Sequence, residues 1–164
     1  MPETAHRAAS QYIERMGLLW ESQGLPRIAG RMLGYLALQP APSTLDDIAG
    51  DLGVSKGSVS SDARRLESLG LVERSSRAGD RRDYYAISPD MPARVLEQKV
   101  AELERLHAAM SAACQLPGTS DVVRSRLAGF RDFQRYVIDH LREMSVSLHH
   151  AGAARVPDPG SERL

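Results

Sequence analysis

The sequence predicts a mainly α-helical protein with a small β-hairpin, a winged helix-turn-helix flanked by dimerisation helices. Two observations carry this prediction. Between Leu45 and Leu69, two short helical patterns are separated by a Gly-Val-Ser turn. Two strand patterns joined by an arginine-rich loop follow directly, up to Ser88. In the fold that has this order of elements, one helix enters the DNA major groove and the hairpin, called the wing, lies beside it.

The first helix of the pair is predicted to end at Leu52, just before Gly53. Ser43 or Thr44 can cap its N-terminus, and Gly53 provides the backbone freedom needed to leave the helix. Its apolar residues recur at i, i+3, i+4 and i+7, which is the spacing of one buried face. They are Leu45, Ile48, Ala49 and Leu52.

The second helix is predicted from Lys56 to about Leu69, with Ser55 as its N-cap. It buries an apolar face made of Val59, Ala63, Leu66 and Leu69. The opposite face carries small hydroxyl side chains, which permit a close approach to the groove, and basic side chains that bind phosphate. The predicted DNA-binding residues of this helix are Ser55, Lys56, Ser58, Ser60, Ser61 and Arg64.

Strands are predicted from Leu71 to Ser76 and from Tyr84 to Ile87, joined by a polar loop. Arginines in such a loop suit contacts to phosphate or to a narrow minor groove, and Asp80 or Asp83 can hold one of them in a fixed orientation. The predicted DNA-binding residues of the wing are Arg77, Asp80, Arg81 and Arg82. The alternative is a solvated charged turn. The two preceding helices favour the DNA-binding interpretation.

Four segments of the chain together resemble the GbsR-type branch of the MarR family of bacterial transcriptional regulators. They are residues 24–36, 45–49, 53–60 and 79–85, in one unbroken order over roughly the first half of the chain. The resemblance implies a homodimeric winged-helix protein that binds double-stranded DNA and represses or activates transcription. It also places the family's Asp-x-Arg wing pattern on Asp80 and Arg82. GbsR-type regulators are associated with choline and glycine betaine metabolism, which implies a quaternary ammonium effector.

The remaining segments are predicted to be helical and to mediate dimerisation. We expect residues 1–23 to form an N-terminal helix joining the dimerisation region, 24–90 the DNA-binding domain, 91–150 the helical dimerisation region and 151–164 a disordered tail. Each of the two long helical segments has a seam, a row of mainly apolar residues spaced alternately four and three apart. The first seam comprises Leu96, Val100, Leu103, His107, Met110 and Cys114. The other comprises Val123, Leu127, Phe130, Gln134, Val137, Leu141, Met144 and Leu148. The alternative is that both helices pack within one chain, and the two interpretations are compatible.

The composition is that of an ordinary globular protein. The chain has 164 residues, 42% of them apolar and 26% charged, with equal numbers of basic and acidic residues. The stretch from Ser55 to Asp83 nevertheless has seven basic residues against five acidic ones, so positive charge gathers on the predicted interface. No apolar run has the length of a membrane span and no signal peptide is evident. We therefore expect a cytoplasmic protein without a membrane partner.

The sequence contains no catalytic signature, so we expect neither an enzyme nor a cofactor. The histidines are scattered, and no metal site is predicted. Cys114 is the only cysteine and is interpreted as a small core residue. Tyr12, Trp20 and Tyr35 are candidate effector-binding residues, because an aromatic cage suits a quaternary ammonium ion. The alternative function is a winged-helix DNA-associated or protein-interaction module that senses no effector.

Overall fold

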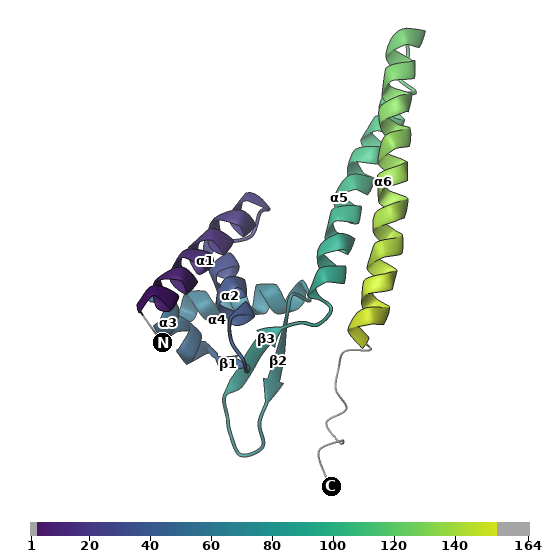
Figure 1. Ribbon diagram of the computed structural model, residues 1–164. Helices are drawn as coiled ribbons and strands as arrows, with labels where there is room; N and C mark the ends of the chain where they lie inside the picture. The colour runs from purple at the N-terminus through teal and green to yellow at the C-terminus, as the bar shows by residue number, and fades with distance from the viewer. Residues whose placement is uncertain (1–2, 154–164) are drawn as a thin grey trace. The chain divides into compact units, whose positions relative to one another are not determined.

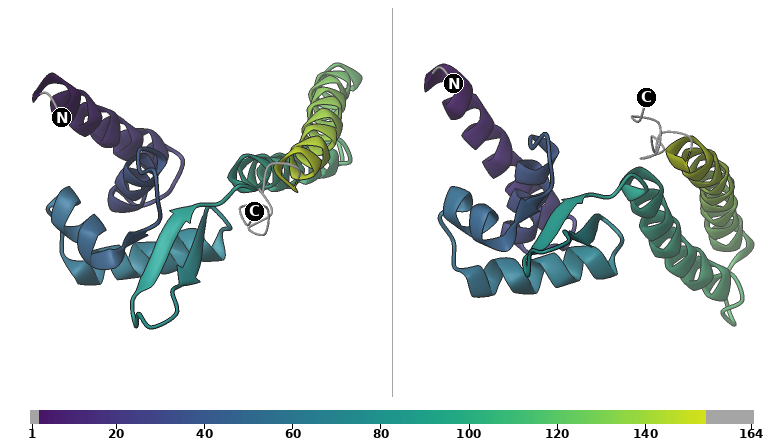
Figure 2. Two further views of the ribbon diagram at one scale, coloured as in Figure 1. Left: turned by 60° about the horizontal axis from the view of Figure 1, so that its bottom comes forward. Right: turned by 90° about the horizontal axis from the view of Figure 1, so that it is seen from below.

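The computed structural model describes residues 3–153 and consists of two compact units, one ending at Met91 and one beginning at Pro92. Figure 1 shows the order of the elements, and Figure 2 shows them from two further sides. The first unit is built from α1 (Glu3–Ser22), α2 (Arg27–Ala37), β1 (Ser43–Thr44), α3 (Leu45–Leu52), α4 (Lys56–Ser68), β2 (Val72–Ser76) and β3 (Asp83–Ile87). The second is built from α5 (Met91–Ala113) and α6 (Asp121–Ala153). The predicted fold class, a mainly helical winged helix-turn-helix, is confirmed.

Helices α1 and α2 pack with their backbones close together because glycines lie at the contact. A Cβ atom added at Gly30 would lie 2.8 Å from both the Met16 carbonyl oxygen and the Cβ of Trp20. One added at Gly34 would lie 2.9 Å from the Cβ of Met16. Side chains at these two positions would force the helices apart. The role of α1 in dimerisation involves a second chain and stays a prediction.

The helix-turn-helix is held by local caps and by a shared core. Thr44 forms a capping box with Asp47, whose backbone N–H donates to the Thr44 hydroxyl at 3.2 Å. Gly53 ends α3 in the left-handed conformation with φ 62°, and the Ser55 hydroxyl accepts the backbone N–H of Ser58. These caps orient α4 against α2 and α3. The core beneath them includes Met32, Leu33, Ile48, Leu52, Val59, Ala63 and Leu66.

The wing belongs to a three-stranded antiparallel sheet in the order β1-β3-β2. Strand β1 was not predicted, because a two-residue strand shows no alternating pattern. It pairs Thr44 with Tyr84, and β2 pairs Ser75 with the same tyrosine. Tyr84 and its neighbour Tyr85 are both buried. Thr44, the residue just before α3, is therefore paired directly with β3, one of the two strands of the wing.

Helices α5 and α6 form an antiparallel hairpin held by contacts along its length (Figure 1). The His107 ring nitrogen Nδ1 lies 3.2 Å from the Arg131 carbonyl oxygen, and Glu104 forms an ion pair with Arg142. The Ser145 hydroxyl donates to the Ala93 carbonyl oxygen. The two long helices thus pack within one chain, as the alternative interpretation had it.

Helix α5 buries the predicted seam of the last helix only in part. Phe130 and Met144 are 55% and 54% exposed, whereas Ile138, which was not predicted, is fully buried. The face of α6 that meets α5 is rotated from the predicted one and follows Leu127, Gln134, Ile138, Leu141 and Ser145. Helix α6 has apolar residues on a second face as well, and spacing alone does not show which face an adjacent helix covers.

The end of the chain differs slightly from the expectation. Helix α6 continues to Ala153, so the first three residues of the predicted tail are helical, and residues 154–164 lie outside the described part of the chain. No helix among the described residues is long and apolar enough to cross a membrane.

Candidate DNA-binding interface

Helix α4 presents the predicted hydroxyl and basic residues on the side away from its core. Lys56, Ser61 and Arg64 are exposed, and Ser58 and Ser60 are half-buried. The buried side of the helix carries Val59, Ala63 and Leu66, together with Asp62. Burial raises the pKa of Asp62. The exposed side therefore has the small hydroxyls and cations that the approach of a helix to a groove requires.

Several of these side chains have partners within the protein. The Ser55 and Ser58 hydroxyls are 2.8 Å apart, and Nε of Arg64 donates to the Ser60 carbonyl oxygen at 3.2 Å. Lys56 Nζ lies 2.7 Å from a carboxylate oxygen of Asp46 at the start of α3. These exposed contacts are weak enough to be exchanged for contacts to DNA.

The wing, by contrast, is held by a network centred on Asp80. Its carboxylate accepts hydrogen bonds from Nε and Nη2 of Arg82, the shortest at 2.7 Å, and from the Arg82 backbone N–H at 2.9 Å. The Tyr84 hydroxyl also donates to it, at 2.7 Å. These bonds from Arg82 and Tyr84 hold the pKa of Asp80 well below its usual range. Asp80 is thus ionised and orients Arg82, as the sequence suggested.

The other arginines of the hairpin have different surroundings. The guanidinium of Arg77 lies 3.9 Å from the centre of the Tyr84 ring. Arg74 pairs with Asp83 across the hairpin and also with Glu67 of α4, its Nε 3.3 Å from that carboxylate. Arg81 is exposed and has no ion-pair or ring partner among residues 3–153. Arg74 therefore links β2 to α4, a contact that sequence spacing did not reveal.

The three predicted effector residues are spread over the first unit. Tyr12 is 38% exposed on α1, Trp20 packs beside Gly30, and Tyr35 is buried. The Tyr35 hydroxyl donates to Asp51 at 2.8 Å, and burial and this bond raise the pKa of Tyr35 to about 12. Within the described part of the chain, no ring contact joins any two of the three.

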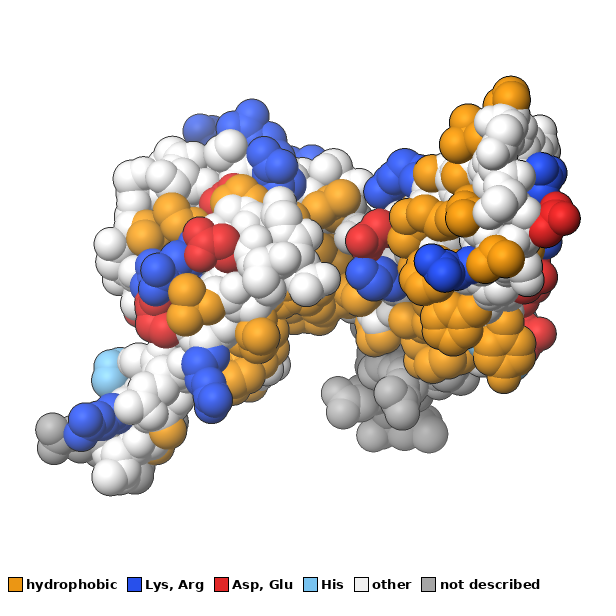
Figure 3. Space-filling model, turned by 90° about the horizontal axis from the view of Figure 1, so that it is seen from above, with side chains coloured by type: hydrophobic (Ala, Val, Ile, Leu, Met, Phe, Trp, Pro, Cys, Tyr) orange, Lys and Arg blue, Asp and Glu red, His pale blue; other side chains and the backbone are white. Residues whose placement is uncertain are grey.

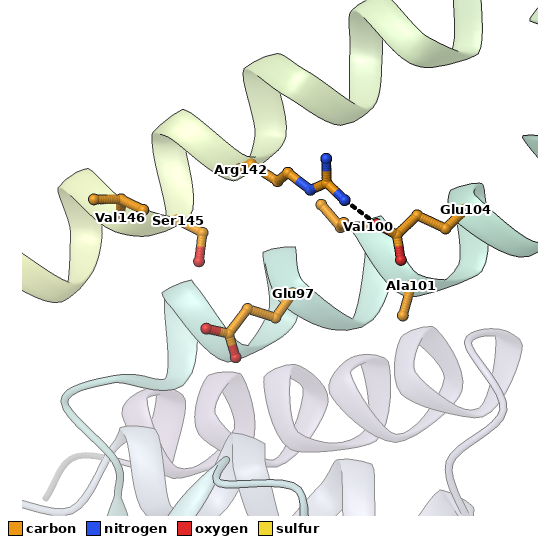
Figure 4. A pocket seen from close by; sticks show the side chains of 7 residues that line it. All are labelled: Glu97, Val100, Ala101, Glu104, Arg142, Ser145 and Val146. Carbon is orange, nitrogen blue, oxygen red and sulfur yellow. Dashed lines mark hydrogen bonds and ion pairs between the residues drawn. The ribbon is translucent and has the colours of Figure 1, made fainter.

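A hollow of about 400 Å³ lies between α5 and α6 in the second unit (Figure 4). Its carboxylates are Glu97, which lies 2.8 Å from Nε2 of His149, and Glu104, which pairs with Arg142. Its apolar lining includes Val100. Both carboxylates already have partners, so neither is a free anchor for a cation. The described residues also contain no cluster of three or more His, Cys, Asp or Glu that could hold a metal ion.

Comparisons with known proteins agree on the class of protein. A sequence model of the MarR family matches residues 23–83. The chain is 33% identical over 129 residues to the HTH-type transcriptional regulator MmpR5 of Mycobacterium tuberculosis, covering 77% of this chain and 78% of that protein. It is 28% identical to the HTH-type transcriptional repressor OpcR of Bacillus subtilis over 51% of this chain and 45% of OpcR.

A solved structure supports the fold over most of the chain. It is a crystal structure of a transcriptional regulator, 28% identical in sequence, with a TM-score of 0.66. The match covers 87% of this chain and 99% of that one.

Proposed function

The chain belongs to the MarR family of helix-turn-helix transcriptional regulators, and from that premise we propose that it binds a palindromic operator as a homodimer. Its relatives regulate transcription and are not described as enzymes. The observation that carries the proposal is that one unit holds both an exposed basic, hydroxyl-rich face on α4 and an ordered basic wing. Following OpcR, we propose repression, in the cytoplasm where bacterial DNA lies.

The two parts of the interface have different tasks in this proposal. On α4, Lys56, Ser58 and Arg64 reach base edges or the phosphates beside them in the major groove. On the wing, Arg81 and Arg82 contact phosphates or the minor groove with little sequence preference. The contact between Arg74 on β2 and Glu67 on α4 links the two parts, although as an exposed ion pair it contributes little stability by itself.

Exposed apolar side chains support the homodimer. Figure 3 shows hydrophobic side chains gathered on the unit formed by α5 and α6. On α6 the large ones include Phe130, Phe133, Tyr136, Met144 and Val146, each more than half exposed. On α1 they include Leu18 and Leu19. An apolar surface of this kind on a single chain is typical of an interface, since each large side chain contributes about 1.5–3 kcal/mol when buried.

We further propose the GbsR-type branch and a small-molecule effector that binds between α1 and the DNA-binding domain. The contacts of Arg31 offer a physical link: its Nε pairs with Glu14 of α1 at 2.7 Å, and its Nη2 donates to the Leu52 carbonyl oxygen at 2.8 Å. Leu52 is the last residue of α3, just before the turn into α4. A ligand that moved α1 would therefore act on the helix-turn-helix, provided that it binds one arrangement more tightly.

The test of the DNA-binding function is to sequence the DNA fragments that co-purify with the protein, then measure binding to the enriched sequence and to a random duplex. A palindromic motif bound at two chains per duplex is expected. Equal affinity for both duplexes, or one chain per duplex, would contradict the proposal.

The effector is tested separately by Trp20 fluorescence titrated with choline and glycine betaine. A saturable change that is accompanied by altered DNA affinity is expected. Trp20→Ala should weaken the effect of the ligand on DNA binding. If neither compound changes fluorescence or affinity, the alternative of a regulator or interaction module without effector sensing is favoured instead.

A further inference from the structure

Tyr84 contacts three charged residues of the wing at once, although the sequence pattern did not place it in the interface. Its hydroxyl donates to Asp80 at 2.7 Å and accepts from Nη2 of Arg82 at 3.2 Å. The centre of its ring lies 3.9 Å from the guanidinium carbon of Arg77 and 5.8 Å from that of Arg82. Polar and cation-π contacts thus converge on one side chain.

Tyr84 itself is rigidly held. It is 6% exposed, and its backbone pairs with Thr44 on one side and with Ser75 on the other. Thr44 is the N-cap of α3, so Tyr84 connects the arginines of a protruding loop to the first helix of the helix-turn-helix. The central position in the sheet restrains the Tyr84 backbone, and burial and the hydroxyl hydrogen bond restrain its ring.

We propose that Tyr84 is a positioning residue for DNA binding, one that holds Arg77 and Arg82 in their DNA-contacting arrangement before DNA arrives. This inference rests on the proposed function. An arginine side chain loses considerable rotational freedom when it is immobilised on DNA. When the hydroxyl and the ring of Tyr84 restrict that freedom beforehand, less is lost on binding. Both the hydroxyl and the ring are needed, because the hydroxyl binds Asp80 and the ring contacts Arg77.

The inference distinguishes Tyr84 from the arginines that it holds. Replacing a phosphate-contacting arginine lowers both the affinity and the salt dependence of binding, because fewer counterions are released. Replacing Tyr84 removes no charge, so the affinity should fall while the salt dependence stays as in the wild type. We expect about a two- to fivefold loss for Tyr84→Phe, which lacks the hydroxyl, and about a tenfold loss for Tyr84→Leu, which also lacks the ring.

The experiment measures binding of the full chain to the enriched duplex over a salt series. The matched control is Tyr85→Phe, which alters the adjacent buried tyrosine and should leave affinity unchanged. Tyr84→Phe should have no further effect in an Arg82→Ala background, whereas a general loss of stability would act equally in both backgrounds. In NMR spectra, the Arg77 side-chain protons should lose their ring-current shifts in Tyr84→Leu but keep them in Tyr84→Phe.

Three results would overturn the inference while leaving the proposed function intact. The first is wild-type affinity in both Tyr84 variants. The second is a reduced salt dependence, which would make Tyr84 part of a lost phosphate contact. The third is an equal loss with and without Arg82. If the wild-type chain binds no DNA, the proposed function itself fails, and the positioning role with it.

Discussion

Replacing Arg82 by alanine tests the wing most directly. Arg82 is held by Asp80 through bonds as short as 2.7 Å. In the wild type, the Arg82 guanidinium therefore neutralises the Asp80 carboxylate. Arg82→Ala removes the cation and leaves the Asp80 carboxylate unpaired close to the DNA phosphates. The variant should bind both specific and random duplexes more weakly, because a wing contact reads the DNA backbone and not its sequence.

The expected magnitude follows from counterion release. Each phosphate contact contributes about 0.9 to the slope of log affinity against log salt, so two wings in a dimer contribute about 1.8. When the salt concentration rises fourfold, from about 50 to about 200 mM, the ratio of wild-type affinity to variant affinity should fall about twelvefold. Removing Asp80 as well should recover part of the lost affinity, because the double variant has no unpaired anion.

The assay is fluorescence anisotropy with labelled specific and random duplexes across a salt series. Arg105→Ala on α5 controls for the loss of one positive charge, and Arg81→Ala gives the effect of a wing arginine that has no ion-pair or ring partner among the described residues. If affinity and salt slope of Arg82→Ala both match the wild type, the wing does not contact DNA through Arg82 and the assignment is wrong. A loss confined to the specific duplex would instead indicate base recognition.

Three further predictions concern stability, assembly and redox chemistry. Gly30→Ala should lower the free energy of unfolding by about 1–3 kcal/mol in urea titrations, because the new methyl group meets α1 at 2.8 Å. Gly50→Ala, where the space is open, should be neutral or stabilising by up to about 1 kcal/mol. Phe133→Asp should convert a dimer to a single-chain mass in sedimentation with helicity retained, since this side chain is 61% exposed on the hairpin; an unchanged dimer would place the interface elsewhere. Cys114→Ser should leave the response of DNA binding to peroxide unchanged, because the thiol is buried; a peroxide effect that disappears in the variant would show a redox switch.

Much of the fold was evident in the sequence because it depends on short-range patterns. The apolar spacing of α3 and α4, the Ser55 cap and Gly53 are local signals, and each appears in the structure where the sequence placed it. The basic loop between two strand patterns likewise indicated the wing. Local hydrogen bonding and helical periodicity act over a few residues, so a single sequence is sufficient to show them.

Long-range pairing decided the remaining features. Thr44 meets Tyr84 only because β3 lies between β1 and β2, and Arg142 meets Glu104 only because α6 packs back along α5. On α6, the apolar pattern fits two faces, and packing against α5 selected the one that contains Ile138. Such contacts join residues whose separation in the chain has no fixed relation to their distance in space. Periodicity therefore identified the elements of this protein, while tertiary packing determined which side chains of those elements meet.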